Sequence, residues 1–413
     1  MKEQLLEKFK RYISIDTQSD PASDEFPSSP GQHELARLLV NELKELGLED
    51  AHADEHAYVM ATLPANISRE APVIGFIAHL DTSPDVSGKN IRPVVHEQYD
   101  GNDLVLDQER NHIMPVKDFP VLNNYTGQTL ITSDGSTLLG ADDKAGIAEI
   151  MEAVAYLINN PDIPHGTVKI LFTPDEEIGK GSDGFNPEKF NADYAYTVDG
   201  SVIGEIQYEN FNAALANIAI QGRNIHPGAA KNIMINANLV GMAFCRMLPE
   251  GERPEHTEKR EGFYHITDFR GTVEKADIQM LIRDHDKQKF EHKKEKLRKA
   301  ANFLNDQYGS GTIHVDIKDQ YYNMNNKIYP VMHIVEQAME AMEQLDIEPV
   351  TRPVRGGTDG ARLSYMGLPC PNLFTGGHNF HGRYEFIPLE SMEKATMTIV
   401  KILEIAAYPG SST

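Results

Sequence analysis

The stretch VIGFIAHLDTSPD, residues 73–85, opens with a run of apolar residues and then places His79 and Asp81 two positions apart. A short apolar run of this kind predicts a strand over residues 73–78 that is buried on both faces, as in a parallel sheet. Side chains two positions apart on an extended chain point the same way, so Asp81 can accept the ring N–H of His79. Such carboxylate–histidine pairs orient metal ligands. The alternative is that the pair only caps the strand.

Similar apolar runs predict further strands over residues 168–173, 194–198 and 372–375. Between the first of these and the opening stretch, an amphipathic helix is expected from about residue 143 to residue 159, with its apolar residues on one face. Strands that alternate with helices in this way indicate an α/β domain. We expect the mainly parallel, mixed sheet of a zinc-peptidase-like catalytic domain, covered by helices.

The pattern changes over residues 211–323, where the sequence predicts a strand, a helix, two strands, a long helix and a final strand. This βαββαβ order is typical of a ferredoxin-like domain. After about residue 324 the α/β pattern returns, and an amphipathic helix is expected over residues 329–345. We therefore expect a discontinuous larger domain, residues 1–210 and 324–413, that is interrupted by an inserted domain, residues 211–323.

Acidic residues and histidines follow the predicted strands at the points where these strands end. Glu176 and Glu177 follow the second strand, Asp199 follows the third, and HNFHG, with His381, follows the fourth. Asp142, in LLGADDKAG, lies at the start of the predicted helix. Because ligands of open α/β sheets bind beyond the carboxyl ends of the strands, we expect these segments to meet there.

This group of acids has one basic residue within its motifs, Lys144, so repulsion among the carboxylates favours bound divalent cations. Carboxylates together with histidines suit zinc, and a bridging carboxylate allows two zinc ions. Cobalt or manganese can substitute for zinc in such a site. Neighbouring loop residues point in different directions, so one of Glu176 and Glu177 can bind metal while the other acts as a base.

The composition excludes several classes of partner. The 413-residue chain has a formal net charge of −23, which repels nucleic acid and anionic lipid. We see neither a signal peptide nor the stretch of about 20 apolar residues that would span a bilayer. Cys245 and Cys370 lie far apart and belong to no metal-ligand pair, which fits a reducing compartment. We therefore expect a cytoplasmic protein.

Seven motifs occur in order along nearly the whole chain: GFIAHLDTSPD, LLGADDKAGIAEI, FTPDEEIGKG, TVDG, GRNIHPGAAKN, RGGTDGARLS and GGHNFHGRYEF. Together they resemble the carboxypeptidase G- and aminoacylase-like di-zinc hydrolases, and among these the tripeptide aminopeptidases. The resemblance implies an enzyme with two zinc ions per subunit that hydrolyses the N-terminal residue from tripeptides.

The resemblance also implies a role for each residue at the predicted sheet edge. The metal ligands that it implies are His79 and Asp199 for one ion, Glu177 and His381 for the other, and Asp142 as the bridge between the two. Glu176 is implied as the general base that activates a water molecule. Asp81 is grouped with it among the catalytic residues because it orients His79.

The inserted domain is expected to act as a lid that supplies substrate contacts. The resemblance implies His226, in NIHPG, as a donor to the oxyanion, although a simple turn histidine is the alternative. Arg283 and Arg355 are candidates for bidentate binding of a peptide carboxylate, and structural pairing is the alternative for both. Because related enzymes pair through the inserted domain, a homodimer through this domain also stays open.

Two other functions stay open from the sequence. A dipeptidase or an N-acyl amino acid deacylase would keep the metals and change the substrate. A non-catalytic, metal-stabilised binding protein on the same fold would be expected to lack the base or one ligand, and here Glu176 and all the implied ligands are present.

Overall fold

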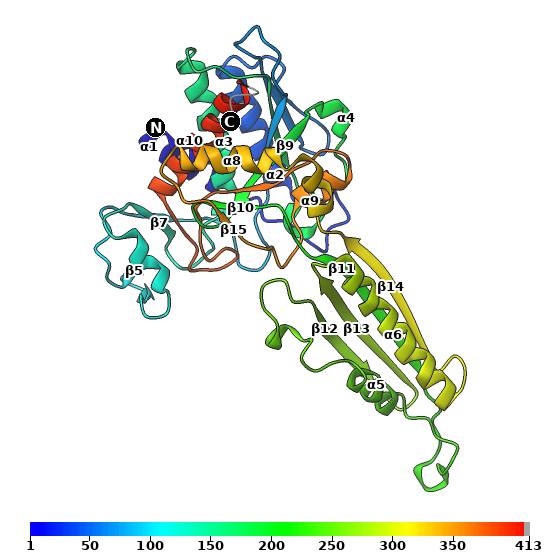
Figure 1. The fold of residues 1–413 in the computed structure, drawn as a ribbon. Coiled ribbons are helices and arrows are strands. Elements are labelled where there is room, and N and C mark those ends of the chain that lie inside the picture. Colours follow the sequence, from blue (N-terminus) through cyan, green and yellow to red (C-terminus); the bar gives the residue numbers. More distant parts are fainter. Residues whose placement is uncertain (409–413) are drawn as a thin grey trace. The chain divides into compact units, whose positions relative to one another are not determined.

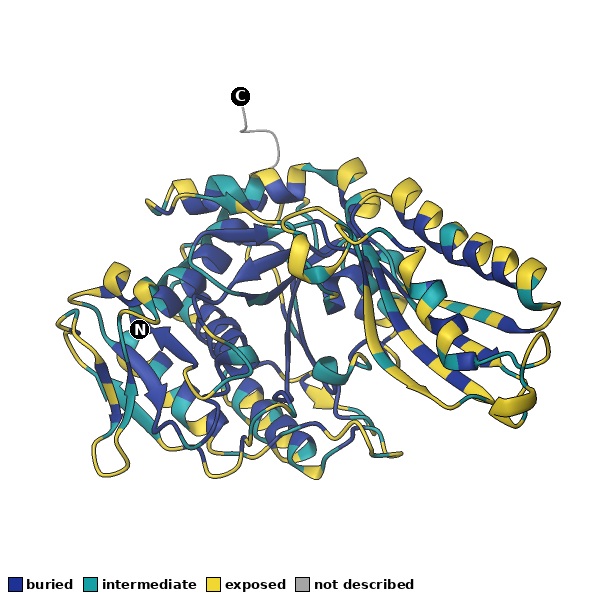
Figure 2. Ribbon diagram, turned by 90° about the horizontal axis from the view of Figure 1, so that it is seen from below, coloured by how far each residue is buried: buried dark blue, intermediate teal, exposed yellow. Residues whose placement is uncertain are grey.

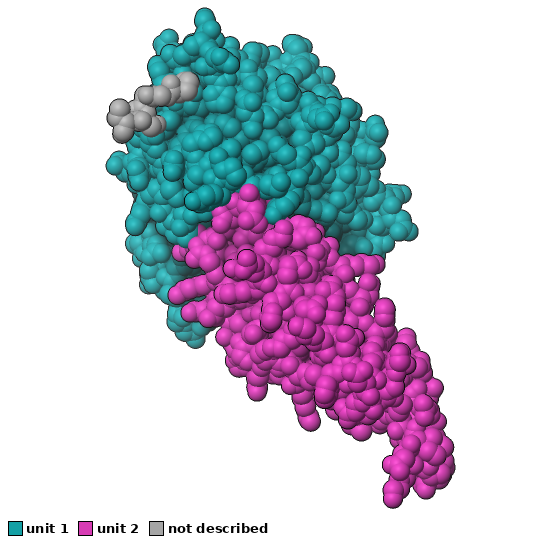
Figure 3. Space-filling model, turned by 45° about the vertical axis from the view of Figure 1, so that its right-hand side comes forward, with its two compact units in different colours: residues 1–208, 327–351, 362–413 teal, residues 209–326, 352–361 magenta. Residues whose placement is uncertain are grey.

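The computed structural model describes residues 1–408, which form two compact units (Figure 3). The larger unit comprises residues 1–208, residues 327–351 and the described residues after 361. The smaller unit comprises residues 209–326 and 352–361. The division differs from the predicted one at its edges, because 209–210, 324–326 and 352–361 group with the smaller unit.

The larger unit is built on one eight-stranded sheet (Figure 1). The order of its strands is β1 (His52–Ala53), β2 (Val59–Leu63), β8 (Val168–Thr173), β3 (Ile74–His79), β9 (Tyr194–Gly200), β16 (Asn372–Phe374), β10 (Glu205–Gln207) and β15 (Val350–Thr351). The four predicted strands are the contiguous parallel ones, β8, β3, β9 and β16, while β1, β2 and β10 supply the antiparallel pairings. The predicted α/β fold with a mainly parallel, mixed sheet is confirmed.

Helices cover the central strands, which explains why β3 is buried at all six positions. The helix α3 (Ala141–Asn159) lies against β3 and β9, and α1 (Lys2–Ile13) and α10 (Leu389–Ala406) pack behind it. Ile77 of β3 packs in a second cluster with Phe190 of α4 (Pro187–Phe190) and Leu363 of α9 (Asp359–Tyr365). Figure 2 shows this buried centre and the exposed outer surfaces of the helices.

Residues 93–133 contribute smaller sheets beside the main one. The strands of a three-stranded antiparallel sheet are, in order, β17 (Phe386–Pro388), β7 (Leu130–Ser133) and β4 (Pro93–His96). A two-stranded ribbon is formed by β5 (Leu104–Asp107) and β6 (His112–Met114). Since β17 lies just after the HNFHG motif, this sheet ties that motif to residues 93–133.

The smaller unit is a four-stranded antiparallel sheet with two long helices. The strand order is β12 (Phe263–Gly271), β13 (Lys275–Asp284), β11 (Asn212–Gln221) and β14 (Ile313–Tyr321). Its helices are α5 (Ala237–Arg246) and α6 (Lys287–Tyr308). Buried and exposed positions alternate along most of β13, so one face of the sheet packs on the helices. The elements follow one another in the predicted ferredoxin-like order.

One predicted helix, over residues 329–345, is interrupted. The structure has α7 (Asn325–Ile328), a 3₁₀ turn at Tyr329–Val331 and α8 (His333–Glu343). Elsewhere in the larger unit, α2 (Pro30–Glu45) is a continuous helix. Pro330 explains the break, because it lacks an N–H group and restricts the residue before it.

Within residues 1–408, no helix combines the length and the apolar character that crossing a membrane requires. Cys245 and Cys370 are both free thiols.

Gly146 allows α3 to approach β9 unusually closely. A Cβ atom on Gly146 would lie 2.0 Å from the carbonyl oxygen of Val198 and 2.5 Å from Oδ1 of Asp143. Neither distance is compatible with van der Waals packing in a dense interior. The position of the whole helix, including its acidic first turn, therefore depends on the absence of a side chain here.

We expect Gly146→Ala to destabilise the protein by about 1–3 kcal/mol, because the methyl group forces α3 away from β9. Alanine in an unconstrained helix would instead stabilise by about 0.5–1 kcal/mol, so the sign of the change is diagnostic. Thermal unfolding followed by circular dichroism measures it. Gly251→Ala is the control, since nothing lies within 4 Å of the Cβ position there. An unchanged or raised melting temperature for Gly146→Ala would contradict the packing argument.

Candidate metal centre

His79 ends β3, and its ring contacts acids on both sides. Nδ1 lies 3.0 Å from the carbonyl oxygen of Asp81 and 3.3 Å from Oδ1 of the same residue. Nε2 lies 2.8 Å from Oδ1 of Asp142. The predicted contact with Asp81 is therefore present, with the backbone carbonyl as the nearer acceptor, and it leaves Nε2 facing the other acids.

Asp142 joins the two histidines that the sequence singled out. Its Oδ1 faces His79, and its Oδ2 lies 3.1 Å from Nε2 of His381. Asp142 and Asp143 depart from helical backbone angles, so the regular part of α3 begins after them, as predicted. The peptide bond between these two residues is cis. One carboxylate thus presents each of its oxygens to a different imidazole, which is the arrangement of a bridging ligand.

Two more acids complete the group around Asp142. Oε2 of Glu177 lies 3.0 Å from Nε2 of His381, and Oδ1 of Asp199 lies 3.7 Å from Nε2 of His79. His79, Asp142 and Glu177 each offer an atom within 4.8 Å of the others. The structure therefore brings together all five predicted ligands, which come from β3, the start of α3, the loop after β8, β9 and the loop after β16.

Asp81 holds the turn that carries the two glutamates. Its Oδ1 accepts the N–H of Glu176 at 2.9 Å, and its Oδ2 accepts the N–H of Glu177 at 3.1 Å. Both glutamates lie in a short 3₁₀ turn, Glu176–Ile178, and Glu176 is half-buried. Because the same carboxylate also lies beside His79, it fixes the relative positions of a ligand strand and of both glutamates.

Asp175, just before this turn, is anchored from another direction. It is fully buried, and its carboxylate accepts the N–H and hydroxyl of Ser28 at 2.7 and 2.5 Å. The side-chain amide of Gln32, at the start of α2, donates to the same carboxylate at 2.7 Å. The loop after β8 is therefore fixed on both sides of Glu176.

The charges of this group perturb one another strongly. Hydrogen bonds to Asp142 and Glu177 raise the pKa of His381 to about 11. Burial alone would lower the pKa of His79, but its acidic neighbours, led by Asp142, raise it well above the usual range. Burial and the charge of Asp142 raise the pKa of Glu177 to about 7 and that of Asp199 to about 6. The cluster therefore attracts positive charge.

The donor set fits divalent cations. Imidazole nitrogens and carboxylate oxygens are the ligands that zinc takes from proteins, and cobalt and manganese accept them as well. Oε1 of Glu177 is buried and has no hydrogen-bond partner among the described residues. A buried carboxylate oxygen without a donor is costly unless a cation satisfies it. His79, Asp142, Glu177, Asp199 and His381 are the residues that would hold such ions.

Several supporting residues were not predicted. Asp143 is fully buried and accepts the backbone N–H of His79 at 3.1 Å. Asp85, the last residue of the opening stretch, lies 3.3 Å from Nδ1 of His381. Glu385 is buried and accepts backbone N–H groups ahead of α3. Of these three residues, only Asp85 could have been suspected from the sequence, because it is a second acid, after Asp81, on the loop that follows β3.

His378 supports the loop that carries His381. Its Nε2 lies 2.7 Å from the hydroxyl of Tyr125, and its ring stacks on Phe386 at 4.6 Å. Burial raises the pKa of Tyr125 to about 12, so the phenol keeps its proton. This contact links the small sheets of residues 93–133 to the loop.

The three remaining predicted residues lie in the smaller unit. His226 is exposed, and its Nδ1 accepts the N–H of Gly228 at 3.1 Å, a turn contact. Nη1 of Arg283 donates to Gln320 at 3.1 Å and to two backbone carbonyls, and the guanidinium lies over Tyr321. These contacts are of the structural kind that the sequence left open.

Arg355 is hydrogen-bonded to the loop of residues 257–261 in the smaller unit. Its Nη1 donates to the carbonyl oxygens of Lys259 and Glu261 at 2.8 and 3.2 Å, and its Nη2 donates to Thr257 at 2.9 Å. The residue precedes α9, which begins at Asp359. Arg355 is thus anchored to residues 257–261.

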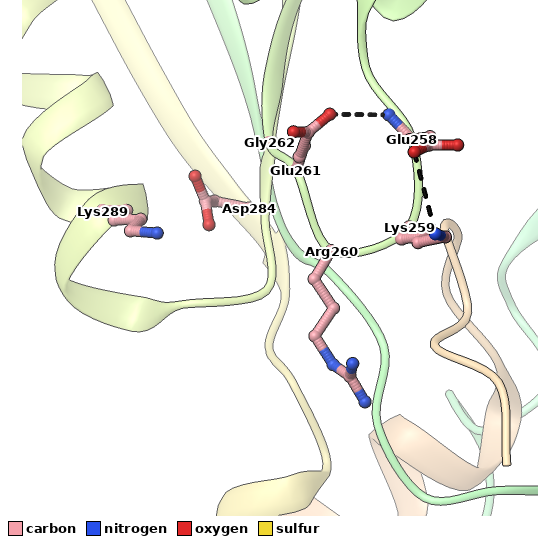
Figure 4. Close-up of a pocket in the computed structure, with 7 residues that line it drawn as sticks. All are labelled: Glu258, Lys259, Arg260, Glu261, Gly262, Asp284 and Lys289. Atoms are coloured by element: carbon pink, nitrogen blue, oxygen red, sulfur yellow. Dashed lines mark hydrogen bonds and ion pairs between the residues drawn. The ribbon is translucent and has the colours of Figure 1, made fainter.

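The same loop forms one wall of a pocket of about 300 Å³ (Figure 4). The lining residues are Glu258, Lys259, Arg260, Glu261, Gly262, Asp284 and Lys289. Several of them pair with one another, since Glu261 accepts the N–H of Glu258 and Lys259 lies 3.8 Å from the Glu258 carboxylate. None of the predicted metal ligands is among these lining residues.

The family and the relatives of the chain agree with this geometry. The model of peptidase family M20/M25/M40 matches residues 133–405. The chain is 58% identical over 403 residues to peptidase T of Alkaliphilus oremlandii, covering 97% of this chain and 98% of the relative. It is 59% identical over 406 residues to peptidase T of Caldanaerobacter subterraneus subsp. tengcongensis, covering 98% and 99%.

Among solved structures, aminopeptidase PepT from Bacillus cereus matches with a TM-score of 0.79 and 25% identity, and the match covers 99% of both chains. Family, relatives and fold agree with the cluster around Asp142 and with the resemblance that the motifs showed. The chain belongs to peptidase family M20/M25/M40, a family of metallopeptidases.

Proposed function

We propose that this protein is an aminopeptidase that removes the N-terminal residue from tripeptides. The observation that supports it best is the cluster in which Asp142 faces both His79 and His381, with Glu177 and Asp199 beside them. The chain matches relatives called peptidase T over nearly its whole length and nearly the whole of theirs. This match supports tripeptides as the substrate class. The two free thiols fit a reducing compartment, and we place the enzyme in the cytoplasm.

We assign two zinc ions to the cluster, with cobalt or manganese as substitutes, because the donors are imidazoles and carboxylates. His79 and Asp199 would hold one ion, Glu177 and His381 the other, and Asp142 both. When bound, such ions lower the pKa of a water molecule and stabilise the negative charge that develops on the carbonyl oxygen.

Glu176 is proposed as the general base. It accepts a proton as water attacks the peptide carbonyl carbon, and it returns that proton to the amine nitrogen as the C–N bond breaks. Its backbone is held by Asp81, which also lies beside His79. The base and the ligand cluster are therefore positioned by a single carboxylate.

The smaller unit is proposed to contact the substrate. His226 would donate to the oxyanion, and Arg283 and Arg355 are the candidates for the peptide carboxylate. A guanidinium has five N–H donors, and the three hydrogen bonds of Arg283 described above all leave from Nη1.

Short peptides are the expected partners, while the net charge of −23 disfavours nucleic acid and membrane surfaces. A homodimer through the smaller unit is proposed from the resemblance alone.

We expect Glu176→Gln to lower kcat for tripeptides by about 10²–10⁴-fold, because proton transfer is lost while the metal ligands stay in place. Metal content, measured by mass spectrometry of the purified protein, should equal that of the wild type. Glu188→Gln, an exposed glutamate of α4, is the control and should keep full activity. Retained activity in Glu176→Gln would show that another residue is the base.

Removal of metal should abolish hydrolysis and also lower the melting temperature. Ligands that bind only the folded state stabilise it, by about 2.7 kcal/mol per site at a free concentration of 100 times Kd. Activity assays and thermal unfolding with and without chelator, followed by addition of zinc, cobalt or manganese, measure both effects. A chelated protein that hydrolyses tripeptides at the original rate would refute the metal-dependent proposal.

A panel of dipeptides, tripeptides, tetrapeptides and N-acetyl amino acids tests the substrate class. Tripeptides with a free N-terminus should give the highest kcat/KM. Preference for dipeptides or for N-acetyl amino acids would instead identify a dipeptidase or a deacylase. Metal binding without hydrolysis of any of them would identify a non-catalytic binding protein.

A further inference from the structure

Glu385 is a buried acid that the proposed mechanism does not use. It lies in HNFHGRYEF, four positions after His381, and is only 1% exposed. Its Oε2 accepts the backbone N–H groups of Leu139 and Gly140 at 2.7 and 2.9 Å. Its Oε1 accepts the N–H of Asp142 at 3.1 Å. All of these donors belong to the short segment that precedes the regular part of α3.

This segment lacks the regular hydrogen bonding of a helix. Gly140 has a positive φ of 81°, and Asp142 has non-helical angles of φ −86° and ψ 102°. Backbone N–H groups at such a place need another acceptor when they are buried. Glu385 supplies that acceptor from a loop that is distant in the sequence.

The loop that carries Glu385 contacts Asp142 in two ways. His381 reaches the side chain of Asp142 at Oδ2, and Glu385 binds its backbone N–H. The start of the loop is fixed as well, because His378 and Phe386 exchange backbone hydrogen bonds at 2.9 and 3.1 Å and Tyr125 binds the His378 ring. A shift of the segment at Asp142 would therefore change its distance from His381.

We propose that Glu385 is a positioning residue that fixes the backbone at Asp142, so that the Asp142 carboxylate stays shared between His79 and His381. The inference rests on the metal centre of the proposed function and adds a residue to it. Partners outside the ligand sphere commonly change metal affinity or activity by about 10–100-fold when they are altered.

The decisive variant is Glu385→Gln. Glutamine has the same shape but turns one of its two acceptor oxygens into an N–H₂ donor, which then faces a backbone N–H. The matched control is Glu152→Gln, because Glu152 is 4% exposed, lies on α3 and pairs with Lys8 at 2.6 Å away from the ligands. Both variants lose a buried carboxylate, and only one of them touches the segment at Asp142.

Binding of Co²⁺ to the metal-free, full-length chain gives a readout that does not depend on catalysis. We expect Glu385→Gln to bind Co²⁺ about 10–100-fold more weakly in competition with a chelator and to show an altered visible absorption spectrum. Its kcat for a tripeptide should fall while KM changes little. Glu152→Gln should keep the Co²⁺ affinity and spectrum of the wild type.

Wild-type Co²⁺ affinity and spectrum in Glu385→Gln would overturn the proposal, whatever its melting temperature. If that variant does not fold, Glu385→Asp takes its place, because a carboxylate shortened by one methylene cannot reach all three N–H groups. Weakened Co²⁺ binding by it supports the proposal, and unchanged binding overturns it. A wild type that binds Co²⁺ but cleaves no tripeptide refutes only the proposed substrate, whereas one that binds no divalent ion refutes both.

Discussion

The carboxylate of Asp142 is the contact on which the rest of this structure depends. Its two oxygens lie 2.8 and 3.1 Å from the Nε2 atoms of His79 and His381, which come from opposite ends of the larger unit's sequence. Glu177 and Asp199 lie against the same two imidazoles. Acids gathered this closely repel one another unless positive charge lies between them. The geometry of the site is therefore also an electrostatic requirement for cations.

Much of this arrangement can be predicted from the sequence, because it follows from local pattern and a simple rule of sheets. Apolar runs identify β3, β8, β9 and β16, and the carboxyl ends of parallel strands lie on one edge. The polar residues that follow those runs must then meet. The arrangement of the smaller unit was predictable for the same reason, since the periodicity and order of its elements define the ferredoxin-like arrangement.

The residues that hold the ligand-bearing segments in place could not be predicted in the same way. Glu385 binds backbone N–H groups of residues 139–142, and every residue except proline offers the same N–H group, so no sequence signal marks the partner. The contact of Tyr125 with His378 depends on how residues 93–133 fold back, which periodicity does not reveal. The break at Pro330 was visible in the sequence and was outweighed by the apolar periodicity on either side.

Neutral donors hold the acids that organise this site. Asp81 and Glu385 accept backbone N–H groups, and Asp175 accepts donors from a serine and a glutamine. Lys144 is buried near Asp81 and Glu385, yet its Nζ donates to the carbonyl of Ile15, and burial lowers its pKa to about 7. A basic side chain bound to these acids would compensate their charge and oppose a metal ion. Neutral donors fix each carboxylate and leave its negative charge to stabilise cations.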